Sequence, residues 1–189
     1  MDKHDVILMV SMAGYIFGYG TLIPKYYQEN NVVAEIEGYK RIYHTSSDYY
    51  FWYPFVIKKS NYRCKGILIP DKDGSLLASI DGYESYPELY DRIQVPVTVV
   101  SDPEARLADI DPASIKAWLY VPSTKTLSLK LDRIFKQMKK HDMDAYKDMM
   151  EKDLWIEKLR LDHPEIVQVL PALFGNGAQE PVPGPSQSG

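Results

Sequence analysis

The chain has 189 residues, a formal net charge of −4 and a single cysteine, Cys64. This length suits one domain with an appendage, and the acidic balance gives no electrostatic reason to expect nucleic acid as a partner. One cysteine excludes an intramolecular disulfide and a cysteine-rich metal site. The four histidines lack metal-binding spacing, so we expect neither a metal nor a cofactor.

The apolar run Val6–Phe17 raises the question of a signal peptide or a membrane span. The residues before it are acidic rather than basic, and Gly14 interrupts it, so we expect neither. The lone cysteine fits a reducing interior. We therefore expect a cytoplasmic protein without membrane association, in which Val6–Val10 forms a strand covered on both faces.

The stretch Ile16–Leu22 is predicted to be a strand end that turns into a loop at Gly18 and Gly20. Such a loop can point consecutive backbone N–H groups at one oxygen, as anion-binding nests do. It is neither a Walker loop, because no Gly-Lys-Ser/Thr follows, nor a dinucleotide-binding GxGxxG, because Ile23 occupies the third glycine position. The pattern alone leaves open whether it is a tight structural turn or a binding loop.

The next segments are predicted from composition. A short helix or a surface loop covers Lys25–Val33, and strand-like residues mixed with charge follow over Val33–Tyr43. The aromatic block Tyr49–Phe55 either walls a pocket or fills the core beneath a loop, and Pro54 within it argues against a central strand. A further strand is predicted over Tyr62–Ile69, where Gly66 permits a bulge or a close approach.

A short helix is predicted over Ser75–Ser85 from the i, i+3 and i+4 spacing of its apolar residues. Glu84 falls one turn after Ile80, beside the apolar stripe. A carboxylate in such a place is costly unless it is paired. Glu84 is therefore either a boundary residue hydrogen-bonded to a loop or a functional acid.

The second half of the chain changes from strand to helix. Strands are predicted over Tyr90–Val100, with an edge or bulge at Pro96, and over Ile115–Val121, with Trp118 in the core. From Thr126 onward the apolar period is helical. A charge cluster in these helices is balanced by nearby acids and is interpreted as a solvated face.

Five segments in one order carry a resemblance: Tyr19–Leu22, Tyr53–Pro54 followed by Tyr62–Leu68, Ile80–Glu84, Tyr90–Arg92 and Ala117–Val121. Together they resemble the gamma-glutamylcyclotransferase-like superfamily. The resemblance covers about Tyr15–Val121 and does not extend to the C-terminal helices. It implies an α+β fold, a small mixed β-barrel flanked by helices with a pocket at one mouth. We accordingly predict the barrel domain over residues 1–122, a packed helical extension over 123–174 and a disordered tail over 175–189.

The resemblance also implies an activity. The free α-amine of a γ-glutamyl amine or peptide attacks its own γ-carbonyl and releases 5-oxoproline, with Glu84 as the acid and base. Backbone N–H groups of the Tyr-Gly loop would hold the substrate. The substrate-binding residues implied in this way are Tyr19, Gly20, Thr21, Leu22, Tyr90, Arg92 and Tyr120, and among the supporting groups Arg92 is also interpreted as a structural ion-pair partner.

Two departures from the superfamily pattern bear on this hypothesis. Gly18 stands where a β-favouring residue is usual, and Ser85 replaces the small glycine that commonly follows the catalytic glutamate. The alternative hypothesis is therefore a non-catalytic module on the same fold that binds a small ligand or a protein. The amphipathic C-terminal helices also allow a homodimer.

Overall fold

The computed structural model describes residues 14–45 and 53–175. Within these ranges a mixed sheet of six strands has the order β4-β6-β1-β3-β2-β5. The strands are β1 (Gly14–Gly18), β2 (Val32–Ile42), β3 (Phe55–Asp71), β4 (Tyr90–Pro96), β5 (Thr98–Ser101) and β6 (Lys116–Pro122). The predicted strand at Val6–Val10, the aromatic residues up to Trp52 and nearly all of the predicted tail lie outside the described residues.

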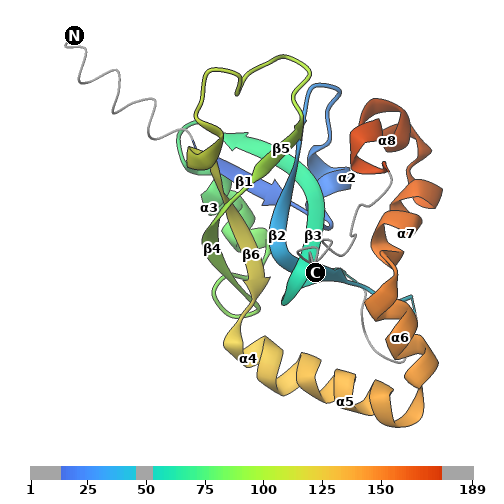
Figure 1. The fold of residues 1–189 in the computed structure, drawn as a ribbon. Helices are drawn as coiled ribbons and strands as arrows, with labels where there is room; N and C mark the ends of the chain where they lie inside the picture. Colours follow the sequence, from blue (N-terminus) through green and yellow to red (C-terminus); the bar gives the residue numbers. More distant parts are fainter. Residues whose placement is uncertain (1–13, 46–52, 176–189) are drawn as a thin grey trace, which may run out of the picture.

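The sheet is curled because consecutive strands occupy its two edges. Neighbouring strands pair antiparallel except β1 and β6, which run parallel with Ile16 opposite Trp118. β4 and β5 are at opposite ends of the strand order, yet only Val97 separates them in sequence. One residue spans only about 3.5 Å, so the two edges must approach each other. The sheet therefore forms a curled half-barrel (Figure 1), and with its helices the fold is α+β, as predicted.

The prediction of a single strand over Tyr90–Val100 is wrong. The segment forms two strands, β4 at one edge of the sheet and β5 at the other. Pro96 has no N–H to continue the ladder and ends β4. The amide of Val97 then donates to the carbonyl of Ile115 at 3.1 Å. The local β-favouring composition is correct for both strands, but it carries no information on which edge each one joins.

The helices flank the half-barrel. They are α2 (Leu22–Tyr26), α3 (Ser75–Tyr83), the 3-10 turn η2 (Pro112–Ser114), α4 (Thr124–Thr126), the π-helical turn η3 (Leu127–Leu131), α5 (Asp132–His141), α6 (Met143–Glu151), α7 (Leu154–Asp162), α8 (Pro164–Val169) and the 3-10 turn η4 (Pro171–Leu173). In Figure 1, α4 and α5 run below the sheet, and α6 to α8 rise along its side. No helix in the described part of the chain is long and apolar enough to cross a membrane.

The C-terminal helices share one hydrophobic core with the sheet. Leu131, Trp155 and Leu159 are buried in the same cluster as Ile16 and Ile67. Aspartates cap the N-termini of α6 and α7: the side chain of Asp153, for example, accepts a hydrogen bond from the amide of Ile156 at the start of α7. The helical extension thus packs directly on the half-barrel, while the domain boundary at residue 122 stays a prediction.

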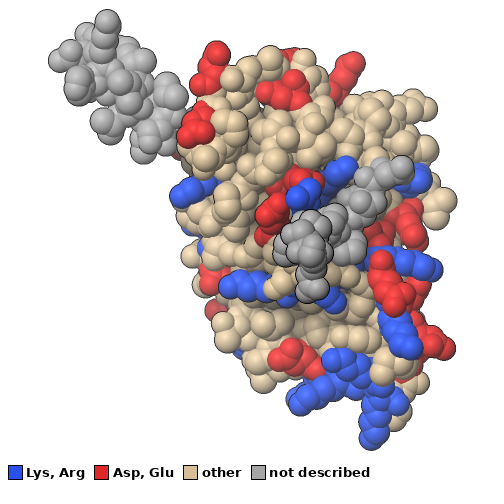
Figure 2. Space-filling model, in the orientation of Figure 1, with Lys and Arg blue, Asp and Glu red and all other residues tan. Residues whose placement is uncertain are grey.

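Charged side chains of both signs cover the surface. Figure 2 shows them mixed across one face, with Lys and Arg gathered at the end where α5 lies. Helix α5 itself carries Lys136, Lys139 and Lys140 together with Asp132. This arrangement is that of a solvated helix face.

Candidate active site

One cavity of about 280 Å³ collects almost all of the predicted site residues. It is lined by the loop that joins β1 to α2, by the end of α3, and by residues of β4 and β6. Every predicted catalytic or substrate-binding residue lines it except Arg92. The lining residues are Phe17, Tyr19, Gly20, Thr21, Leu22, Tyr53, Pro54, Tyr83, Glu84, Ser85, Leu89, Tyr90 and Tyr120.

The loop Tyr19–Leu22 is held in a narrow space. β1 ends at Gly18, and Thr21 directly precedes α2. A hydrogen bond from the Ile23 amide to the Gly20 carbonyl at 3.0 Å closes the turn between them. A Cβ at Gly20 would lie 2.6 Å from Cγ of Pro54, which is closer than real Cβ atoms approach. In the described residues, no backbone acceptor is found for the amides of Gly20 and Thr21. Both residues line the cavity.

Glu84 lies immediately after α3. Its amide donates to the carbonyl of Ile80 at 2.8 Å, and its side chain is half-buried. Among the described residues, no hydrogen bond or ion pair to its carboxylate is present. Burial raises the pKa of Glu84 from 4.5 to about 7, and the charge of Lys25 opposes this shift. A carboxyl group with this pKa exchanges protons readily near neutrality.

Tyrosines surround the carboxyl group. The hydroxyl of Tyr19 donates to the carbonyl of Tyr120 at 2.9 Å, and the hydroxyls of Tyr83 and Thr21 lie 3.2 Å apart. Burial raises the pKa of Tyr19 and of Tyr90, and the neighbouring charge of Glu84 adds to both shifts. These phenols are therefore neutral hydrogen-bonding groups near neutral pH.

Arg92 lies outside the cavity and has a structural environment. Its Nε atom is 3.0 Å from Oδ1 of Asp81, and its guanidinium group lies over the rings of Tyr86 and Trp118. The same Asp81 oxygen accepts a 2.6 Å hydrogen bond from the hydroxyl of Tyr120. Arg92 thus neutralises the carboxylate that orients Tyr120. Trp118, predicted to lie in the core, is only half-buried beneath Arg92.

Several lining residues were not among the predicted site residues. Tyr53 and Pro54 belong to the aromatic block, for which a pocket wall was one of two interpretations, and both line the cavity. Tyr83 and Leu89 carry no sequence signal, because exposed apolar residues next to a helix end are common. Ser85 also lines the cavity, and its φ of +54° explains why a glycine suits this position.

Comparison with known proteins identifies the family. Residues 16–145 match the sequence model described as "Gamma-glutamyl cyclotransferase, AIG2-like". The chain belongs to this family. The match includes Glu84 and the whole loop Tyr19–Leu22, and it ends before α7. A comparison with curated proteins found no significant match.

Solved structures similar to this chain cover about three quarters of its length. A protein of Arabidopsis thaliana is 15% identical, with a TM-score of 0.44 over 74% of this chain and 92% of that chain. A structure described as a gamma-glutamyl cyclotransferase is also 15% identical, with a TM-score of 0.42 over 75% of this chain and 88% of that one. The assignment of this AIG2-like chain to its family rests on the sequence match.

Proposed function

We propose that this AIG2-like protein is a cyclotransferase that releases 5-oxoproline from a γ-glutamyl amine or peptide. The observation that supports this most strongly is the placement of Glu84: its carboxyl group is unpaired among the described residues and lines the same cavity as the Tyr19–Leu22 loop. A half-buried carboxylate without a partner is costly to stability. Such a cost is typical of groups that are kept for chemistry.

The reaction needs one group that moves protons in both directions. The substrate α-amine loses a proton to the Glu84 carboxylate as its nitrogen attacks the γ-carbonyl carbon, and a five-membered ring closes. The bond from the γ-carbon to the leaving nitrogen then breaks, and Glu84 returns the proton to that nitrogen. No oxidant, metal or external water enters the balance. A pKa of about 7 suits both steps, because the group is neither too weak a base nor too weak an acid.

The loop supplies the complementary function. Ring closure places negative charge on the former carbonyl oxygen, and backbone N–H groups fixed in place stabilise such charge without having to reorganise. The amides of Gly20 and Thr21 are suited to this role because no backbone acceptor for them is found in the described residues. Since both reacting groups belong to one molecule, the enzyme mainly has to hold a folded conformer. A cavity of about 280 Å³ suits a small substrate.

The test is direct. The purified protein is incubated with γ-glutamyl amines and dipeptides, and 5-oxoproline is measured by mass spectrometry. Product is expected from the wild type, and Glu84→Gln is expected to lower turnover by about 10²-fold or more. Glu88→Gln is the matched control, because Glu88 carries only an exposed ion pair to Lys125 and does not line the cavity. The absence of product from every substrate, or full activity of Glu84→Gln, would favour the binding module.

A further inference from the structure

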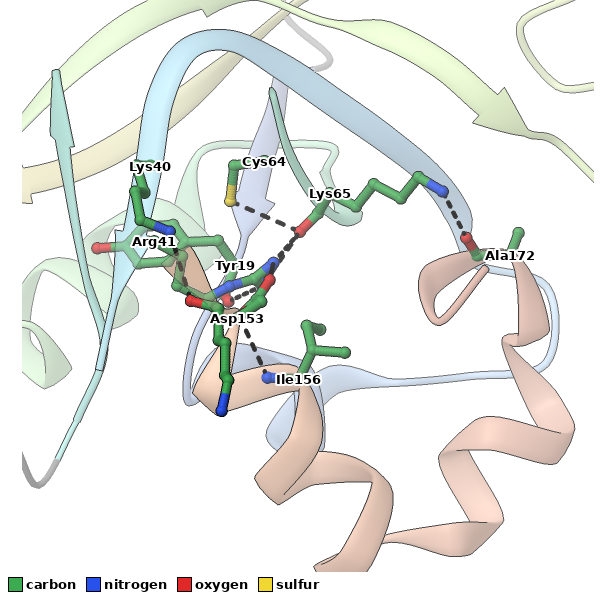
Figure 3. A network of polar contacts seen from close by, with 9 residues as sticks. Tyr19, Lys40, Arg41, Cys64, Lys65, Asp153, Ile156 and Ala172 are labelled. Atoms are coloured by element: carbon green, nitrogen blue, oxygen red, sulfur yellow. Dashed lines mark hydrogen bonds and ion pairs between the residues drawn. The ribbon is translucent and has the colours of Figure 1, made fainter. Parts of the chain in front are cut away.

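A fully buried arginine lies behind the candidate substrate loop. The side chain of Arg41 in β2 is 0% exposed. Its Nη1 atom donates to the carbonyl of Tyr19 at 2.8 Å, and its Nη2 atom donates to the carbonyl of Lys65 at 2.9 Å. Nη2 also lies 3.3 Å from Oδ2 of Asp153 (Figure 3). One side chain therefore joins the loop, strand β3 and the start of α7.

The contact to Tyr19 fixes a whole peptide unit. The carbonyl of Tyr19 and the N–H of Gly20 belong to one planar trans peptide, so they point in opposite directions. The carbonyl points to Arg41, and the Gly20 N–H is therefore directed to the other side. Gly20 lines the cavity and its amide has no backbone acceptor in the described residues. Arg41 thus sets the orientation of the Gly20 amide, one of the two loop amides assigned to ligand binding under the proposed function.

Arg41 needs a counter-charge to remain in this place. A buried guanidinium is costly unless a carboxylate and further hydrogen bonds compensate for the lost hydration. Asp153 provides the carboxylate, and it is itself fixed because its Oδ1 atom accepts a hydrogen bond from the Ile156 amide. The two oxygens of one side chain therefore have separate tasks: Oδ1 caps α7, and Oδ2 neutralises Arg41.

The carboxylate comes from a part of the chain that the family match does not reach. The match ends at residue 145, and Asp153 follows it. A second contact joins the same C-terminal part to the neighbouring strand β3: Nζ of Lys65 lies 3.4 Å from the carbonyl of Ala172 in η4. Figure 3 shows both contacts, between Arg41 and Asp153 and between Lys65 and Ala172. The C-terminal part therefore contacts both β2, whose Arg41 binds the loop, and the neighbouring strand β3.

We propose that Arg41 and Asp153 are positioning residues, through which the C-terminal helices hold the Tyr19–Gly20 peptide in its ligand-binding orientation. Only the expected effect on kcat rests on the proposed function. The order of the loop is a property of the protein without substrate. It can be measured whether or not the protein makes 5-oxoproline.

Two variants of Asp153 separate its tasks. Asp153→Asn keeps an oxygen that caps α7, because asparagine is a good N-cap residue, but it removes the charge. Asp153→Glu keeps the charge and lacks a favoured cap residue. Asp148→Asn is the matched control, because Asp148 belongs to the same helical extension and forms only an exposed pair with Lys152.

The first readout is amide exchange and backbone order by NMR without substrate. In Asp153→Asn, protection of the Ile23 amide, which closes the loop onto Gly20, is expected to fall about tenfold. The order parameters of Gly20 and Thr21 are expected to decrease with it, while the Ile156 amide keeps its protection. Asp153→Glu is expected to show the reverse: a less protected Ile156 and an unchanged Ile23. Equal losses in both variants, or an unchanged loop in Asp153→Asn, would overturn the proposal.

The second readout is steady-state kinetics of 5-oxoproline release. Asp153→Asn is expected to lower kcat about tenfold with little change in KM, because the loop amides act on charge that develops in the transition state. Asp153→Glu and Asp148→Asn are expected to retain kcat. If the wild type releases no product while Asp153→Asn loosens the loop, the proposed function fails and the positioning role stands. An unchanged kcat in an active Asp153→Asn enzyme would remove the catalytic part of the proposal.

Discussion

Glu84 is anchored to Ile80 by a 2.8 Å hydrogen bond between its amide and the Ile80 carbonyl, and Ile80 is fully buried. The last turn of α3 therefore fixes the backbone of the candidate acid in the core, while its side chain lines the cavity. Arg92, interpreted from the sequence as a structural ion-pair partner, binds Asp81 and not Glu84. Burial is therefore the main influence on the pKa of the Glu84 carboxyl group.

The first prediction concerns this titration. The carboxyl carbon of Glu84, followed by ¹³C NMR, is expected to titrate with a midpoint near pH 7, because burial disfavours the charged form. As a base, Glu84 must be ionised, so kcat/KM for 5-oxoproline release is expected to fall about tenfold per pH unit below this midpoint. The resonance is assigned by its absence in Glu84→Gln. A midpoint near 4.5 would show that the carboxylate is solvated and would contradict the proposed role.

The second prediction concerns stability. The pKa of Glu84 is about 7 in the folded protein, whereas an exposed glutamate, as in the unfolded chain, has a pKa of 4.5. The folded state therefore binds the proton more tightly than the unfolded state. The wild type therefore loses stability as pH rises from about 4.5 through 7, and stays at the lower value above that range. Glutamine does not titrate. Glu84→Gln is expected to be more stable than the wild type by about 1–3 kcal/mol at pH 8, after allowance for partial exposure, and by much less at pH 5.

Urea unfolding at the two pH values measures this difference. Glu88→Gln serves as the control: it makes the same chemical change at an exposed residue, and is expected to alter stability by less than about 1 kcal/mol at either pH. A Glu84→Gln variant that is less stable than the wild type at pH 8 would indicate that the carboxylate has a favourable partner in solution.

Much of the site was predictable because its signals are local. The two glycines of the Tyr19–Leu22 loop and the spacing of Glu84 after Ile80 are visible in the sequence, and the family resemblance relates them to each other. The structure places them around one cavity. Their catalytic and binding roles stay predictions, which the experiments above test.

The rest was not predictable because it depends on contacts between distant segments. Arg41 appears in the sequence as one charge in a mixed strand, and only the fold shows that it is buried between the loop and α7. The division of Tyr90–Val100 into two strands requires the curl of the sheet. Pro96 signals a break there, but it cannot indicate that the next strand joins β2.

The third prediction concerns Ser85. Its φ of +54° lies in the left-handed region, where a residue with a Cβ is strained by about 1–2 kcal/mol. Ser85→Gly relieves this strain, while the unfolded chain gains about 0.5–1 kcal/mol of conformational entropy. The net effect expected in thermal unfolding is a gain of up to about 1 kcal/mol. Ser79→Gly, the same change inside α3, is expected to destabilise the protein, because its backbone is helical. Destabilisation of similar size in both variants would contradict the left-handed geometry at Ser85.

The fourth prediction concerns Gly66, where β3 passes close to the end of β1. A Cβ at this position would lie 2.4 Å from the carbonyl oxygen of Gly18 and 2.7 Å from the ring of Phe17. Backbone cannot move away as a flexible side chain can, so Gly66→Ala is expected to cost about 2–3 kcal/mol. Because Gly18 directly precedes the Tyr19–Leu22 loop, the cavity is expected to change shape as well.

Gly82→Ala is the matched control: no atom lies within 4 Å of a Cβ there, and in helix α3 alanine should stabilise by about 0.5–1 kcal/mol. Urea unfolding measures both, and equal midpoints for Gly66→Ala and the wild type would show that β1 and β3 are farther apart in solution.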